Sequence, residues 1–178
     1  MKNKISTAML TKLAMMTAIS IVLLVAVRIP FPPAPFLVFD PADMPIYITS
    51  FAYGPMAGLI VTLVVSLIQA FALGGDGLYG FLMHFVATGI AALVIGIMYE
   101  HCKTKKQAIK ALVVGVVVTT IVMCGMNLLI TPLYMGLEVK AVLVMLPTVI
   151  VPFNLLKAGI NSLFTFVLYK RISGFLHK

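Results

Sequence analysis

Three long stretches of this chain contain no Asp, Glu, Lys or Arg: Met44–Gly75, Gly77–Tyr99 and Ala111–Leu137. Each is longer than the roughly 20 apolar residues that cross the hydrocarbon core of a bilayer. Hydrophobic residues make up 62% of the 178 residues and charged residues 10%, with a mean hydropathy of +1.14. A soluble domain of this size could not bury so much apolar surface. The sequence therefore predicts a membrane protein that crosses the bilayer several times.

The same composition excludes several other classes. A disordered chain and a disulfide scaffold do not fit, and the net charge of +8 lies in terminal and loop clusters, unlike the basic face of a nucleic-acid binder. Cys102 and Cys124 have neither CxxC nor His-ligand spacing, so we expect no metal site. The first apolar run is interpreted as a retained helix because no small-residue cleavage site follows it.

We predict an all-α integral membrane protein, a single domain with six transmembrane helices in a compact bundle. A proline-rich segment, residues 29–43, is expected to form an extended loop outside the lipid or covered by protein, where it could touch a ligand. Thr131-Pro132 is expected to end the fifth helix, and Pro152 to begin the sixth after an amphipathic connection. The second helix is short, and the predicted bounds are 7–27, 44–53, 56–73, 78–101, 106–130 and 152–172.

Lysine and arginine cluster in three places: before the first helix, between the fourth and fifth, and after the sixth. With six crossings, all three clusters fall on one side of the membrane, which the positive-inside rule assigns to the cytoplasm. We therefore expect both termini to be cytoplasmic.

Lys157 is the residue that the bilayer would tolerate least. A lysine at membrane depth costs about 2.5–3.5 kcal/mol, so it should face a cavity or a partner. Asn154 and Asn161, three residues before and four after it, share its helical face. The alternative is that Lys157 reaches the outer interface and Asn154 bonds backbone. For Asn127, lining the same cavity and bonding a neighbouring helix are equally consistent with its position.

Other polar residues have ordinary structural interpretations. We expect His84 to pack with a local hydrogen bond, Asp43 to cap the second helix and Asp76 to lie in a turn. The sequence contains no Walker, HExxH or GxSxG motif and no pair of intramembrane carboxylates, so no catalytic residues are predicted. Interfacial anchoring is the first interpretation, and ligand contact the second, for three tyrosines: Tyr47, Tyr79 and Tyr134.

The first helix carries a small-xxx-small pair, Ala14 and Ala18, in the run KLAMMTAIS. Such a pair allows another helix to approach closely, although alanine is common enough in membrane helices for the pair to arise by chance.

The order of these features resembles the substrate-binding S components of energy-coupling factor (ECF) vitamin transporters, and among them the riboflavin-specific members. The resemblance covers nearly the whole chain and rests on the AxxxA pair, the proline-rich loop leading to FDPADMP, and the segments AYGPMAG, NLLITPLY and VPFNLLKAG. The last segment, with asparagine and lysine three residues apart after proline, is the most specific.

The resemblance implies roles for particular residues. Asn127, Asn154 and Lys157 would hold the polar edge of the isoalloxazine ring. The outer loop would close over the ligand through Leu37, Phe39 and Asp40, and Tyr79 is added as a ligand contact. Ala14 and Ala18 would dock against a transmembrane T component driven by two cytoplasmic ATPases, in a prokaryotic cytoplasmic membrane. No cofactor is implied, since riboflavin would be the transported ligand.

Two departures from the family pattern keep alternatives open. Thr62, Ser66 and Gln69 stand where many riboflavin-type members carry a glutamate and a Lys-Asn pair, and His84 stands where an asparagine is expected. The cargo could therefore be another vitamin or a related flavin. An alternative of a different class is a membrane-embedded enzyme or accessory subunit in which Lys157 and His84 do chemistry.

Overall fold

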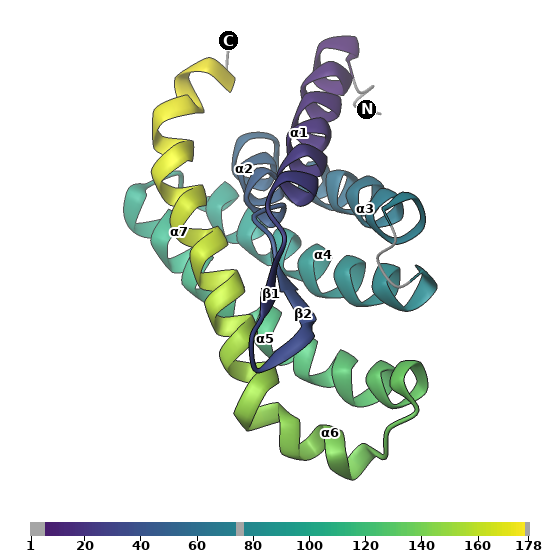
Figure 1. Ribbon diagram of the computed structural model, residues 1–178. Helices are drawn as coiled ribbons and strands as arrows, with labels where there is room; N and C mark the ends of the chain where they lie inside the picture. The colour runs from purple at the N-terminus through teal and green to yellow at the C-terminus, as the bar shows by residue number, and fades with distance from the viewer. Residues whose placement is uncertain (1–5, 74–76, 177–178) are drawn as a thin grey trace.

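The structure is a computed structural model that describes residues 6–73 and 77–176, with side chains up to Arg171. Figure 1 shows a helical bundle with one small β-hairpin running down its middle. In chain order the elements are α1 (Thr7–Ala26), β1 (Ile29–Phe31), β2 (Ala34–Phe39), α2 (Asp43–Tyr53), α3 (Pro55–Ala72), α4 (Gly77–His101), α5 (Lys105–Met135), α6 (Val139–Met145), the π-helical turn η1 (Leu146–Ile150) and α7 (Val151–Leu176).

Five helical segments in the described residues are long and apolar enough to cross a membrane: α1, α3, α4, α5 and the continuous stretch Val139–Arg171. Their outward faces carry large apolar side chains such as Val22, Ile121 and Leu163, each more than 60% exposed. Exposing such apolar surfaces to water would be unfavourable, whereas contact with lipid tails is not. The helical content and these spans confirm the predicted class, an all-α membrane protein with several crossings.

Helix α2 is the short second helix and forms the centre of the bundle. Its 11 residues rise only about 16 Å, too little to cross the hydrocarbon core alone. Nine of them are buried, because α2 packs against α1, α3, α4 and α7. Gly54, with φ of 92°, turns the chain directly into α3. This arrangement places the N-terminal end of α2, beginning at Asp43, inside the protein.

The first four predicted helices begin and end within one residue of the observed ones. The prediction that Thr131-Pro132 ends the fifth helix is wrong, because α5 continues to Met135 and ends at Gly136, whose φ is 65°. Near a helix end, Pro132 removes only one late amide bond, and the Thr131 hydroxyl donates to Asn127 Oδ1 at 2.9 Å.

The connection predicted between the last two membrane helices is itself helical. Helix α6 leads through η1 into α7, which begins at Val151, one residue before the predicted start at Pro152, with no break in the helical chain before it. In the π turn, the Val151 N–H bonds to the Leu146 carbonyl, five residues back. Such a widened turn relieves the clash of a proline ring with the preceding turn, which explains how Pro147 and Pro152 both fit.

The proline-rich loop is extended, and it pairs with itself as an antiparallel hairpin. Ile29 lies opposite Phe39 and Pro30 opposite Val38, with an irregularity after Pro30. The hairpin rests on α7, where the rings of Phe31 and Phe153 lie 5.4 Å apart. Leu37 packs into the same small apolar cluster. The hairpin thus covers one side of the bundle, next to the start of α2 (Figure 1).

Candidate ligand-binding cavity

A cavity of about 380 Å³ lies beneath the hairpin. Residues from the end of α1, from the hairpin, and from α2, α3, α4, α5 and α7 line it. Its volume falls in the range of small-molecule sites, which combine apolar walls with a few placed polar groups. The polar groups here come from helices that are far apart in sequence.

Lys157 reaches this cavity from α7. Its Nζ donates to Asp40 Oδ2 at 2.7 Å and to the Val38 carbonyl at 3.4 Å. The side chains of Lys157 and Asp40 are 16% and 4% exposed, so this is a buried ion pair. Asp40 Oδ1 also accepts from the Ala42 N–H at 3.2 Å. Lys157 therefore lies at the cavity with a carboxylate partner instead of extending to the outer interface.

Asn161 links the backbone at Asp40 with that at Lys157 without lining the cavity. Its Nδ2 donates to the Asp40 carbonyl at 3.0 Å and to the Lys157 carbonyl at 3.1 Å. The side chain is fully buried and is not among the cavity-lining residues. Its place on the helical face of Lys157 thus serves to hold the base of the hairpin against α7.

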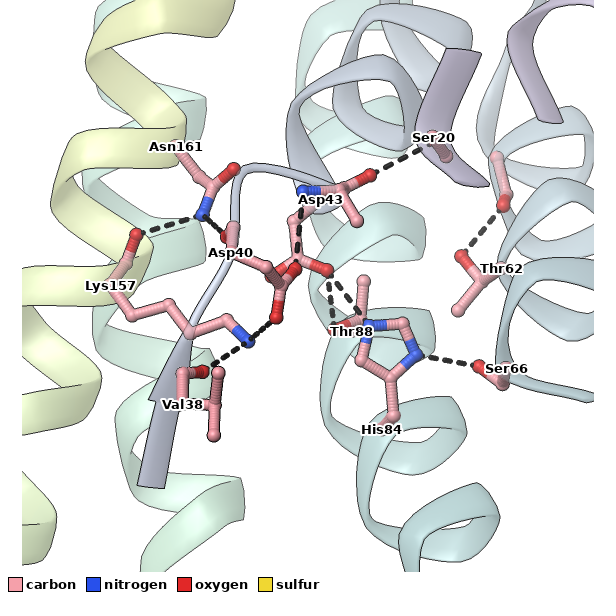
Figure 2. A network of polar contacts seen from close by, with 12 residues as sticks. Ser20, Val38, Asp40, Asp43, Thr62, Ser66, His84, Thr88, Lys157 and Asn161 are labelled. Carbon is pink, nitrogen blue, oxygen red and sulfur yellow. Dashed lines mark hydrogen bonds and ion pairs between the residues drawn. The ribbon is translucent and has the colours of Figure 1, made fainter. Parts of the chain in front are cut away.

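Asp43 faces α4 and does not cap α2. No side-chain cap bond is present at that helix start. Asp43 Oδ1 instead accepts from Thr88 Oγ1 at 3.1 Å and lies 3.0 Å from His84 Nε2. The other ring nitrogen of His84 lies 2.7 Å from Ser66 Oγ on α3. Figure 2 shows the imidazole between these two partners, so His84 joins three helices and also lines the cavity.

Two carboxylates therefore lie three residues apart at the base of the hairpin, each beside a basic side chain from a different helix. Asp40 faces Lys157 of α7, and Asp43 faces His84 of α4 (Figure 2). Both carboxylates are buried, each with an exposed fraction of 3%, at the point where the proline-rich segment meets the bundle. Each buried carboxylate thus has a hydrogen-bonding side chain beside it, as burial requires.

Asn127 and Asn154 both line the cavity and are buried, with exposed fractions of 1% and 3%. Each Nδ2 donates to the carbonyl one turn earlier in its own helix, of Met123 and Ile150 respectively, at 2.8 Å. One amide hydrogen of each side chain is thereby used locally, and a second hydrogen remains on the nitrogen. For Asn154, bonding backbone and facing the cavity therefore hold together. Asn127 lines the cavity, and its printed hydrogen bonds lie within α5 and do not reach a neighbouring helix.

The remaining predicted contacts divide into two groups. Leu37 and Asp40 line the cavity, whereas Phe39 and Tyr79 are not among its lining residues. Phe39 packs against the apolar cluster under the hairpin. Tyr79 makes an edge-to-face contact with Tyr134, at 5.9 Å between ring centroids, and Tyr134 does line the cavity. Tyr79 thus contacts a cavity-lining residue without lining the cavity itself.

The sequence analysis missed a row of mostly polar residues on one face of α5, which their four-residue spacing indicates. Thr119, Met123, Asn127 and Thr131 recur every four residues along α5, and all four line the cavity. Residues at i and i+4 share a helical face. The pairing of Asp43 with His84 had no comparable signal, since 41 residues separate the two.

Ala14 and Ala18 lie on the exposed face of α1. The buried face of this helix carries Leu13, Met16 and Ser20. The alanine pair therefore leaves a shallow, apolar surface on the outside of the bundle, separate from the cavity.

Comparison with known proteins agrees with this geometry. The family model for the substrate-specific component of ECF transporters matches residues 8–169. The chain is 31% identical to the riboflavin transporter RibU of Staphylococcus aureus (strain TCH60), over 95% of this chain and 92% of that protein. It is 28% identical to the riboflavin transporter FmnP of Bacillus subtilis (strain 168), over 83% of each chain.

A solved structure of the S component of a bacterial ECF transporter has the same fold. It superposes with a TM-score of 0.81 at 30% identity, covering 95% of this chain and 97% of that one. Sequence match, fold and the polar cavity beneath the hairpin all lead to one assignment: this chain belongs to the family of substrate-specific components of ECF transporters.

Proposed function

We propose that this protein is the riboflavin-binding subunit of an ATP-driven importer. The observation that carries the proposal is the polar wall of the cavity, where Asn127, Asn154 and Lys157 converge from α5 and α7. Two relatives of this chain bear the name riboflavin transporter. The size of the cavity and its closure by the hairpin suit a small flat molecule.

The chemistry of the wall matches the pyrimidine edge of a flavin. That edge alternates carbonyl acceptors with an N–H donor, and a carboxamide offers both complements. Lys157 adds a cationic donor for a carbonyl, held in place by Asp40 at 2.7 Å. Leu37 and Phe153 supply apolar surface beside these groups. The cavity therefore offers a neutral flavin both hydrogen-bonding groups for its polar edge and apolar surface for its ring.

Transport requires partners in this proposal. The chain supplies cargo binding, and an ATPase pair acting through a transmembrane component supplies energy. Ala14 and Ala18 form the docking surface, since small exposed residues let a partner helix approach closely. Both termini are cytoplasmic, as the lysine clusters predict. The first turn of α1 and the last turn of α7 lie at the same end of the molecule in Figure 1, which supports that orientation.

Reconstitution tests the proposal. The protein is placed in proteoliposomes with the transmembrane component and ATPases of an ECF module, and uptake of labelled riboflavin is measured with and without ATP. We expect uptake that requires both ATP and this subunit. Equal riboflavin uptake with and without this subunit would contradict the proposal. If the complex takes up another vitamin and not riboflavin, the assignment of riboflavin as the cargo is wrong.

A further inference from the structure

A second hollow, of about 220 Å³, lies between the C-terminal ends of α1 and α3. We call it the α1–α3 groove, and its lining residues are Leu24, Val25, Arg28, Gln69 and Leu73. Its volume is below the roughly 300–1,000 Å³ of typical small-molecule sites, so it is too small for a second cargo molecule. Leu24, Arg28 and Gln69 also line the ligand cavity, so the groove adjoins that cavity.

The apolar part of the groove faces outward. Val25 is 58% exposed and lies on the same side of α1 as Val22, which is 64% exposed. Leu24, 3% exposed, is the buried residue of the groove, and Leu73 follows the last residue of α3. Because α1 and α3 are both long and apolar enough to cross a membrane, this side of the groove opens toward lipid tails.

Arg28 lies at the end of the groove that is nearest the membrane surface. The 20 residues of α1 rise about 30 Å, which matches the hydrocarbon core of a bilayer. Arg28 comes directly after the C-cap residue Val27, and its side chain is exposed. Its guanidinium is therefore expected at the depth of the lipid headgroups.

The charge of Arg28 has no partner among the described residues, where neither an ion pair nor a hydrogen bond of its side chain is found. The two carboxylates that line the adjacent cavity are already engaged, Asp40 by Lys157 and Asp43 by His84. A guanidinium presents a planar set of N–H donors that matches the oxygens of a phosphate group. Arg28 is thus suited to bind an anion from outside the chain.

We infer that the α1–α3 groove binds a membrane phospholipid, with the phosphate on Arg28 and one acyl chain along Val25 and Leu73. The order of the groups carries the inference: a cation at headgroup depth stands directly above apolar side chains that face the lipid. A phospholipid has the same order, a phosphate above its acyl chains. The bound lipid lies against Leu24, and so against the wall of the cavity. This inference goes beyond the proposed function and does not depend on the cargo.

Lipid binding to the full-length protein in detergent tests the inference. Native mass spectrometry follows titration with phosphatidylglycerol, and with a diacylglycerol that has the same acyl chains and no phosphate. Arg28→Gln removes the charge, and Val25→Trp fills the groove. The matched controls are Lys140→Gln, an exposed cation of α6, and Val22→Trp, which is exposed on α1 outside the groove. All four positions are exposed, so every variant should unfold at the wild-type temperature.

Arg28→Gln should weaken phosphatidylglycerol binding about tenfold or more, since a charge-assisted hydrogen bond is lost. Val25→Trp should weaken it at least about tenfold, because the side chain occupies the place of the acyl chain. Both controls should bind as the wild type does. Diacylglycerol should bind more weakly than phosphatidylglycerol to the wild type, and Arg28→Gln should not change its binding. Soluble glycerol phosphate should not displace the lipid.

Wild-type phosphatidylglycerol affinity in Arg28→Gln or in Val25→Trp would overturn the inference. So would an equal loss in the matched control of either variant, because binding would then follow net charge or surface bulk and not the groove. Displacement by glycerol phosphate would show a site for a soluble phosphate compound and would exclude the role of the acyl chain. Riboflavin is absent from these titrations, so failure of the lipid site and failure of the proposed function are distinguished.

Discussion

The cavity wall and the outward face of α1 are built in opposite ways. The wall buries polar and charged side chains that bind one another, such as Lys157 with Asp40. The outward face of α1 exposes small apolar ones, Ala14 and Ala18. The first arrangement suits recognition of a polar molecule, and the second suits a close helix contact in lipid. The difference teaches that cargo binding and partner docking can be altered separately on this chain.

The two regions are nevertheless joined at one point. Ser20, on the buried face of α1, donates to the Ala42 carbonyl at 3.0 Å. In the sequence, Ala42 lies between Asp40 and Asp43, the two carboxylates at the base of the hairpin. Helix α1 therefore contacts the segment that organises the cavity, while its opposite face stays free.

The largest effect should come from removing the charge on the wall. Lys157→Met leaves the Asp40 carboxylate buried and uncompensated, which should lower the free energy of unfolding by about 3–5 kcal/mol. Riboflavin affinity should fall more than about 30-fold, since a buried charged donor is lost. Thermal unfolding in detergent and fluorescence titration measure the two effects.

The double variant Asp40→Asn with Lys157→Met separates stability from binding. It should recover much of the stability, because no buried charge is left unpaired, and should still bind riboflavin weakly. Wild-type affinity in either variant would remove Lys157 from the binding site.

A smaller effect should follow from filling the outward face of α1. Ala14→Leu with Ala18→Leu should reduce riboflavin uptake by the reconstituted transporter at least about tenfold, because bulk at a close helix contact costs about 1–3 kcal/mol. Riboflavin affinity of the isolated protein should not change. Ala141→Leu, at an exposed alanine of α6, serves as the control. Equal loss of binding and uptake would break the distinction between the two regions.

The smallest effect should come from Ser66→Ala, which removes one of the two polar partners of His84. The loss of a single hydrogen bond should lower the free energy of unfolding by about 1 kcal/mol. Riboflavin affinity should change less than about threefold, since Asp43 still holds the imidazole. Thr62→Val, whose hydroxyl bonds only Gly58 within α3, is the comparison. An affinity loss as large as that of Lys157→Met would make His84 a direct ligand contact.

Hydropathy and turn residues were enough to predict most of the fold. Charge-free runs locate the long helices, and the Gly54-Pro55 step separates α2 from α3. The errors arose at prolines, where local rules predict a break. Pro132 lies near a helix end that tolerates one missing amide bond, and Pro147 lies in a π turn that carries α6 on into α7.

The site was predictable where one helix carries the pattern. Asn154 and Lys157 lie three residues apart, and the cost of a lysine in the membrane indicates a cavity or partner. The partners of His84 were not predictable, because they come from α2 and α3 and depend on how the hairpin enters the bundle. Asp43 looked like a helix cap for the same reason: its sequence neighbours say nothing about α4.

Titration of the purified, flavin-free protein with riboflavin tests the central claim most directly. The chain contains no tryptophan, so flavin emission can be followed without interference from indole fluorescence. We predict saturable quenching at one flavin per chain, lost in Lys157→Met and kept in Ala14→Leu with Ala18→Leu. A folded wild-type protein that leaves riboflavin emission unchanged would contradict the account.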